Sequence, residues 1–218
     1  MMSKTSCIIF TLASILILSL TTFIIYLIIV TTFPFNVKFH ITNFSLEQFN
    51  LTTNNTLYYN FRVNITARNP NNNGKIHYRR ITAVAWYKDN DFAWVSLTPF
   101  DQSKKSTNLL GPIVFEGNYV INLKEKQLNE YKEETRVGIY KDLAVDLELK
   151  IKAKFGGFKS GHISLAQCRR LKVPLISNSE SSSPPIFNVT RCKKRSQDHS
   201  SSVWILSSRS RSKPGRGW

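Results

Sequence analysis

Acidic residues, cysteines and metal-ligand patterns are scarce in this sequence, and each scarcity argues against a class of protein. Only 14 Asp and Glu residues accompany 30 Lys and Arg residues, and 218 residues include only three cysteines. Four histidines lie without metal-ligand spacing, at positions 40, 77, 162 and 199. A glycine-rich phosphate loop and a nucleophile elbow are both absent. The acids Asp89 and Asp91 fit a solvated turn better than a catalytic pair. We therefore expect no enzyme, no metal site and no cofactor.

Charged residues are absent from one long run, residues 8–30, which is almost entirely apolar. A bilayer core requires about 20 apolar residues at helical rise, so this run is long enough to cross it. The alternative is a cleaved signal peptide, whose apolar region spans about 7–15 residues before a small-x-small site. Here the run is longer and no Ala-x-Ala pattern follows it. The sequence therefore predicts a retained membrane anchor that contacts the lipid bilayer through residues 8–30, after a short cytosolic leader at residues 1–7.

Five Asn-x-Ser/Thr sequences, the acceptors for N-glycosylation, all follow the apolar run: Asn43, Asn50, Asn54, Asn64 and Asn188. Because all five lie on the same side of the apolar run, they favour a topology in which the domain after the run lies outside the cytosol. Lys4 and the α-amino group precede the run, and this weak positive-inside bias points the same way.

Alternating apolar and polar residues dominate the sequence after the anchor. Residues 57–67 place one apolar set on a single face, which is typical of a half-buried strand: Tyr59, Phe61, Val63, Ile65 and Ala67. Residues 143–155 alternate in the same way, and Asn122 is expected to cap a short helix that extends to about Glu134, with Leu128 and Tyr131 on its inner face. About seven short strands separated by turns predict a mainly β fold, an immunoglobulin-like or fibronectin-like antiparallel β-sandwich. We expect a juxtamembrane segment and first strand at 31–56, and the sandwich at 57–176.

The net charge of +16 is unevenly distributed along the chain. Residues 191–218 hold eight basic residues and one acid, which account for +7 of that total. The Ser/Pro-rich and basic residues 177–218 are expected to form a disordered tail, since they offer little apolar surface to bury. The moderately basic remainder favours an acidic surface, such as anionic lipid headgroups or acidic cell-wall polysaccharide, over nucleic acid.

Cys168 and Cys192 are the two cysteines on the far side of the anchor, and an oxidising compartment permits a disulfide between them. The alternative, two unpaired thiols, stays open.

Several segments together resemble the plant NDR/HIN-like (NHL) proteins, whose outer part is a group 2 late embryogenesis abundant (LEA) domain. The resemblance rests on the strand that ends in Asn69-Pro70-Asn71, on the aromatic segment 76–78, on the Gln- and Lys-containing segment 99–107, and on the cysteines. It covers roughly residues 8–193.

The resemblance implies a seven-stranded sandwich with one helix at the plasma membrane, in a signalling or adhesion component of pathogen defence and stress responses. For Asn69, Pro70 and Asn71, turn formation is favoured over ligand binding. We expect partners among membrane or cell-wall proteins, and the alternative is a lipid- or polysaccharide-binding module. The sequence leaves the oligomeric state open.

Overall fold

The computed structural model describes residues 4–32, 37–72, 74–155, 158–176 and 187–196. The chain divides into two compact units, Met1–Phe35 and Asn36–Trp218, and each is described by itself. The first unit is the helix α1 (Lys4–Thr32). Within it, Ile8–Ile28 is long and apolar enough to cross a membrane. Its large apolar side chains are exposed on every face of the helix. The expected N-terminal apolar helix is therefore present.

Hydroxyl groups along α1 do not interrupt its apolar surface, because they bond to the helix itself. The Thr11 hydroxyl donates to the Ile8 carbonyl at 2.8 Å, and Ser19 donates to the Leu16 carbonyl at 2.8 Å. Such back-bonding satisfies polar groups that would otherwise be costly to place in lipid.

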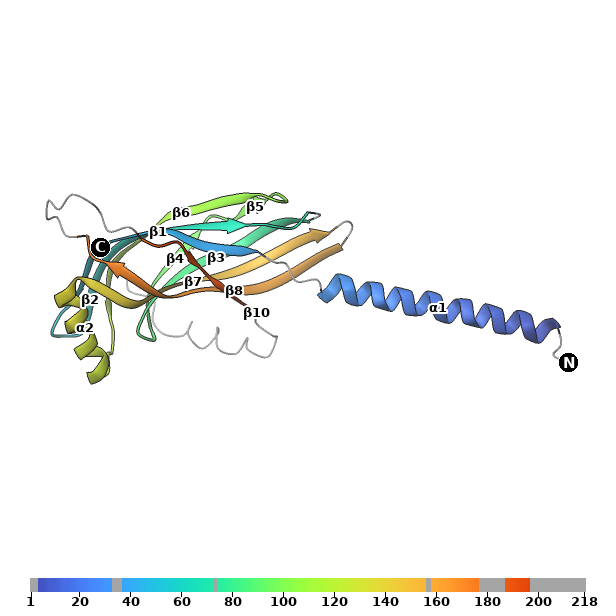
Figure 1. The fold of residues 1–218 in the computed structure, drawn as a ribbon, viewed down its shortest axis with the longest axis horizontal. Coiled ribbons are helices and arrows are strands. Elements are labelled where there is room, and N and C mark those ends of the chain that lie inside the picture. Colours follow the sequence, from blue (N-terminus) through green and yellow to red (C-terminus); the bar gives the residue numbers. More distant parts are fainter. Residues whose placement is uncertain (1–3, 33–36, 73, 156–157, 177–186, 197–218) are drawn as a thin grey trace, which may run out of the picture. The chain divides into compact units, whose positions relative to one another are not determined.

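The second unit consists of two antiparallel sheets and one helix (Figure 1). Sheet A has the order β6 (Thr107–Val120), β2 (Thr56–Arg68), β1 (Lys38–Leu51) and β9 (Thr190–Arg191). Sheet B has the order β10 (Lys193–Ser196), β8 (Phe158–Pro174), β7 (Ile139–Phe155), β3 (Gly74–Tyr87) and β4 (Asn90–Leu97), and β5 (Phe100–Gln102) pairs with β3. The mainly β, antiparallel sandwich is confirmed. Among the described residues seven strands are long, and β5, β9 and β10 are short.

Aromatic side chains from both sheets fill the space between them. Phe49 of β1 packs edge-on against Tyr87 of β3, with ring centroids 5.0 Å apart. Phe61 of β2 stacks on Phe115 of β6 at 4.7 Å and also approaches Phe92 of β4 at 6.1 Å. Each fully buried ring of this kind contributes about 1.5–3 kcal/mol of hydrophobic stabilisation. The inner faces of the two sheets therefore form one continuous core.

The alternation of β2 produces the inward face that the sequence predicts. All five predicted apolar residues are buried, and the polar residues between them point outward. Between β2 and β6 the register shifts after Val63, where Gly111 approaches closely. A Cβ atom at Gly111 would lie 2.8 Å from the Val63 carbonyl oxygen, and its φ of +135° also disfavours other residues.

The helix α2 (Glu125–Val137) begins later than the sequence suggests. Its N-cap is Lys124 and not Asn122, because the Gln127 side chain accepts a hydrogen bond from the Lys124 N–H at 3.0 Å and closes the first turn there. Tyr131 is buried and Leu128 packs against the core, as expected. Gly138 ends the helix with a left-handed φ of 72°.

The sandwich extends beyond the predicted limits of 57 and 176 on both sides. β1 is an interior strand of sheet A, although its residues fall in the segment 31–56 that was expected to precede the sandwich. β9 pairs with β1 and β10 pairs with β8, so part of the segment expected to be disordered is ordered. These two short strands have too few residues to show an alternating pattern. The remainder of the expected tail, 177–186 and 197–218, lies outside the described residues.

Candidate interaction surface

An open hollow of about 800 Å³ lies beside α2, and three of the charged residues that line it form ion pairs with each other: Lys88, Glu130 and Glu134. The Lys88 ammonium lies 2.7 Å from a Glu130 oxygen and 3.1 Å from a Glu134 oxygen. Burial acts to lower the pKa of Lys88, but its hydrogen bonds to the two glutamates outweigh burial and raise that pKa. Hydrogen bonding to Lys88 lowers the pKa of Glu130. Lys88 therefore stays protonated, and the two glutamates neutralise its positive charge.

Glu134, the buried carboxylate of this cluster, has a second partner besides Lys88. The Tyr87 hydroxyl donates to Glu134 at 2.7 Å, and burial together with this contact raises the pKa of Tyr87. The Gln127 amide donates to the Lys88 carbonyl at 3.1 Å. These contacts attach α2 to the β3–β4 turn, where Lys88 and Asp89 have positive φ. The cluster is thus explained by packing, and no group of three or more metal-ligating side chains occurs in the described part of the chain.

Asn69, of the predicted turn motif, is fully buried and bonds to backbone groups on two loops. Its amide nitrogen donates to the carbonyls of Gly74 and Ser103, both at 3.0 Å. Its amide oxygen accepts from the backbone and side-chain nitrogens of Asn71, at 3.1 and 2.8 Å. Both polar atoms of the amide are used in holding the loops, so these contacts account for Asn69 and Asn71 as turn-forming residues. Pro70 lies between them and is half-buried.

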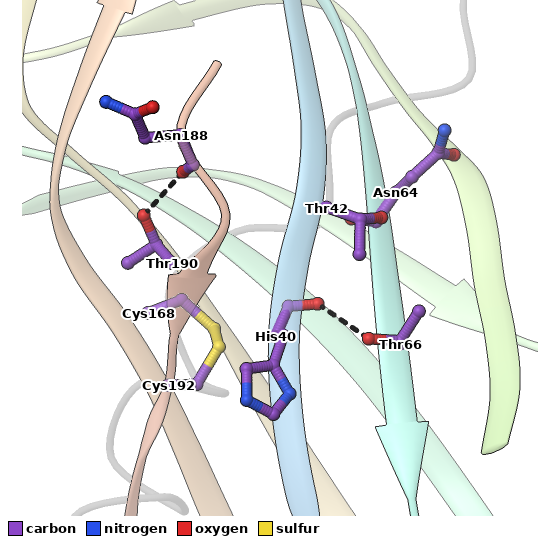
Figure 2. Close-up of a disulfide and its surroundings, with 8 residues drawn as sticks. All are labelled: His40, Thr42, Asn64, Thr66, Cys168, Asn188, Thr190 and Cys192. Atoms are coloured by element: carbon purple, nitrogen blue, oxygen red, sulfur yellow. Dashed lines mark hydrogen bonds between the residues drawn. A yellow bond between two sulfur atoms is a disulfide. The ribbon is translucent and has the colours of Figure 1, made fainter.

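The disulfide joins the end of the described chain to the sandwich (Figure 2). Cys168 of β8 is bonded to Cys192, which lies between β9 and β10. The Cys192 N–H also donates to the Phe39 carbonyl at 2.9 Å. Because β9 belongs to sheet A and β10 to sheet B, residues 190–196 cross from one sheet to the other beside this bridge.

The five acceptor sequences share a location on sheet A or its loops. Asn43 and Asn50 are exposed on β1, Asn54 is exposed in the β1–β2 turn, and Asn188 is exposed just before β9. Asn64, on the interior strand β2, is half-buried. None of the five lies on a strand of sheet B.

Asn64 is the least accessible of these acceptors. It lies directly opposite Asn43 in the β1–β2 register. Its amide oxygen is buried without a hydrogen-bond partner among the described residues, and a Cβ atom at Gly111 would lie 2.9 Å from it. The outward orientation predicted for Asn64 is correct, but its surroundings leave less room for a glycan than the strand pattern suggests.

The outer face of sheet B carries exposed basic and large apolar side chains. Arg80 of β3 lies opposite Lys150 of β7, and both are exposed. Trp94 is 49% exposed and Ile163 is 54% exposed. This face, which we call the B face, consists of outward residues of β3, β4, β7 and β8.

Comparison with known proteins gives a consistent result. The family model described as late embryogenesis abundant protein matches residues 64–168. NDR1/HIN1-like protein 10 of Arabidopsis thaliana is 32% identical over 159 residues, covering 72% of this chain and 69% of that protein. NDR1/HIN1-like protein 3 of the same plant is 34% identical over 160 residues, covering 73% and 68%. This chain belongs to the NDR1/HIN1-like family.

Membership makes the chain a plant stress- or defence-related protein with a late embryogenesis abundant domain. The family match begins at Asn64 in β2 and ends at Cys168 in β8. It therefore includes the Asn69 turn, α2, and β3, β4, β7 and the first part of β8, which form most of the B face. Sequence reasoning missed the pairing of Lys88 with Glu134, because only folding brings the β3–β4 turn against α2.

Proposed function

We propose that this NDR1/HIN1-like protein is a non-enzymatic, single-pass plasma-membrane protein that presents its B face to membrane or cell-wall protein partners in stress or defence signalling. The N-terminus is cytosolic and the sandwich is extracellular. The observation that carries the proposal is the distribution of glycan acceptors: all five lie on sheet A or its loops, and sheet B has none. Glycans on sheet A would cover that side and leave the B face as the accessible protein surface.

The composition of the B face supports the same assignment. Aromatic residues and arginine are enriched at the centres of protein interfaces, because they bury large areas and bond through polar tips. The Arg169 guanidinium lies 5.3 Å from the centre of the Trp86 ring and 2.8 Å from a carboxylate oxygen of Asp146. This arrangement fixes two large side chains before binding, which reduces the entropy lost on association.

The membrane assignment is supported by α1. Its apolar residues show no one-sided pattern, which an amphipathic surface helix would require. Acidic and basic residues are both absent from Ile8–Ile28. An uncharged helix of this length is stable in a bilayer and unfavourable in water.

A pair of single substitutions tests the B face by adding one glycan to either side of the sandwich. Ser96→Asn on β4 creates an N-glycosylation acceptor together with Thr98. Ser96 is exposed and faces outward opposite Thr82. Val120→Thr creates an acceptor at Asn118 on β6 of sheet A, where both positions are exposed. Proximity labelling from the outer domain in intact plant cells then measures which neighbours each variant retains.

The Ser96→Asn glycan should remove most of the protein neighbours labelled by the wild type, and the Val120→Thr glycan should leave them. Glycan occupancy on both variants is verified by gel mobility before and after glycosidase treatment. The opposite pattern, with neighbours retained by Ser96→Asn and lost by Val120→Thr, would assign binding to sheet A.

A further inference from the structure

Basic residues from several chain segments gather at the end of the sandwich where β1 begins. We call this surface the basic end, and its described members are Lys38, Arg68, Lys75, Lys104, Lys105 and Lys152. The β1–β2 register places Lys38 opposite Arg68. The β3–β7 register pairs His77 with Lys152, two residues from Lys75. Residues far apart in the sequence therefore share one end of the fold.

Hydrogen bonds hold the loops of the basic end together. The Lys105 N–H donates to the Asn71 carbonyl at 3.2 Å, and the Asn69 N–H donates to the Ser106 carbonyl at 2.9 Å. The Asn69 side chain binds both Gly74 and Ser103. The loop that follows β5 is thus fixed beside the β2–β3 turn, and its two lysines are presented on a supported backbone.

Acidic partners are scarce at the basic end. The two loops, residues 69–73 and 103–106, contain no acid, and Asp101 of the adjoining strand β5 lies 2.7 Å from the His77 ring nitrogen. Within the described ranges, none of the six basic residues takes part in an ion pair. At the opposite end, around α2, the basic residues alternate with acids, and Lys88 and Arg136 form ion pairs with them. The charge is thus concentrated at one end of the domain.

Like charges placed opposite each other on neighbouring strands destabilise a sheet unless something neutralises them. Lys38 pairs in register with Arg68, and Lys104 precedes Lys105 directly. An external anion bound at this end would offset the repulsion.

The short segment between α1 and β1 indicates which kind of anion lies near the basic end. Five residues, 33–37, separate the end of α1 from the start of β1, and a chain of that length spans at most about 18 Å. A bilayer that contains α1 therefore keeps the first residues of β1 close to its headgroups. We propose that the basic end binds anionic, phosphate-bearing headgroups on the outer side of the membrane that holds α1. The inference rests on the proposed membrane anchor.

Lysine acetylation footprinting on the full chain in lipid nanodiscs tests this contact. Discs of phosphatidylcholine alone are compared with discs that also contain phosphatidylserine, and mass spectrometry measures the acetylation rate of each lysine. Lys75, Lys104 and Lys105 should react about fivefold more slowly in anionic discs, following the attraction of a basic side chain to an anionic surface. The exposed lysines of the α2 end are the internal reference: Lys126, Lys132 and Lys141. The protection should disappear in about 1 M salt, where the Debye length is about 3 Å.

Two matched charge reversals sharpen the result. Arg68→Glu/Lys75→Glu/Lys104→Glu should abolish the protection of the remaining Lys105, whereas Lys126→Glu/Lys132→Glu/Lys141→Glu should preserve it. Each triple variant changes the net charge by the same amount, so a difference between them reports location.

Equal acetylation rates in both discs would overturn the proposal. Protection by polygalacturonate added to phosphatidylcholine discs, without protection by phosphatidylserine, would assign the basic end to acidic polysaccharide. Failure of the chain to remain in discs after carbonate washing would refute the membrane anchor itself, and that result is distinct from equal rates in stable discs.

Discussion

The Tyr78 hydroxyl donates a 2.9 Å hydrogen bond to the amide oxygen of Gln102, and both side chains are almost fully buried. The amide nitrogen of Gln102 donates in turn to the Ala67 carbonyl of β2 at 2.7 Å. Tyr78 belongs to sheet B and Ala67 to sheet A, so one glutamine joins the two sheets at the basic end. Burial also raises the pKa of Tyr78, which keeps its hydroxyl protonated as a donor.

Gln102→Leu should lower the free energy of unfolding by about 2 kcal/mol, because it leaves the Tyr78 hydroxyl and the Ala67 carbonyl buried without their partner. The control is Lys104→Gln, an exposed change in the same loop, which should alter stability by less than about 0.5 kcal/mol. Chemical denaturation measures both. Indistinguishable unfolding midpoints for the two variants would show that the glutamine is not a structural joint.

Lys88→Met should destabilise the domain by about 3 kcal/mol, because the buried Glu134 carboxylate would lose its cation. The Lys88 and Glu134 side chains are only 4% and 6% exposed, so water cannot replace the ammonium. Arg136→Met removes an exposed partner of Glu133 on the same helix and should leave the thermal midpoint essentially unchanged. A thermal midpoint for Lys88→Met equal to that of Arg136→Met would contradict a stabilising role for the cluster.

Replacing both Cys168 and Cys192 by Ala should cost about 3 kcal/mol, the value that the chain-entropy model gives for a loop of this size. The two residues are 24 positions apart in the sequence. Denaturation under non-reducing conditions compares the variant with the wild type, and a non-reduced digest identifies the linked peptides. Two free thiols in protein taken from the cell surface would exclude the bridge in that compartment.

Asp146→Asn should change the pH dependence of stability. Burial raises the pKa of Asp146 above its usual range, and the bonds to Arg169 only partly oppose this effect. The folded state therefore holds the proton more tightly than the unfolded state. This contribution is fully present below the unfolded pKa and is lost as pH rises through the folded pKa. The thermal midpoint of the variant should thus rise relative to that of the wild type as the pH increases from acidic to neutral. A difference that stays constant or shrinks would contradict the raised pKa.

Local patterns predicted much of this fold from the sequence. The inward face of β2 and the inner face of α2 follow from periodicities of 2 and 3.6, which depend only on neighbouring residues. In β7 the alternation of residues 143–155 puts Asp146 on the outward face, but that side chain is only 3% exposed beside Arg169. The pattern indicates which face is outward, and it does not reveal what packs over that face.

Long-range pairing accounts for most of what the sequence did not predict. Asn69 and Ser103 are joined by a hydrogen bond across 34 positions, and Lys88 and Glu134 across 46. The short strands β9 and β10 depend on β1 and β8 for their hydrogen bonds. Such contacts have no local signature, since they exist only after the two sheets have met.

Site-by-site glycopeptide mapping of the full chain, recovered from carbonate-washed plant membranes, tests the central claim most directly. The claim is that the chain is a membrane-anchored protein whose sandwich lies outside the cytosol. The chain should remain in the washed membranes and carry glycans at exposed acceptors of sheet A or its loops: Asn43, Asn50, Asn54 and Asn188. Asn64 should stay unmodified, because its amide is confined by β1 and by Gly111. A chain released by carbonate, or retained with all five asparagines unmodified, would contradict this account.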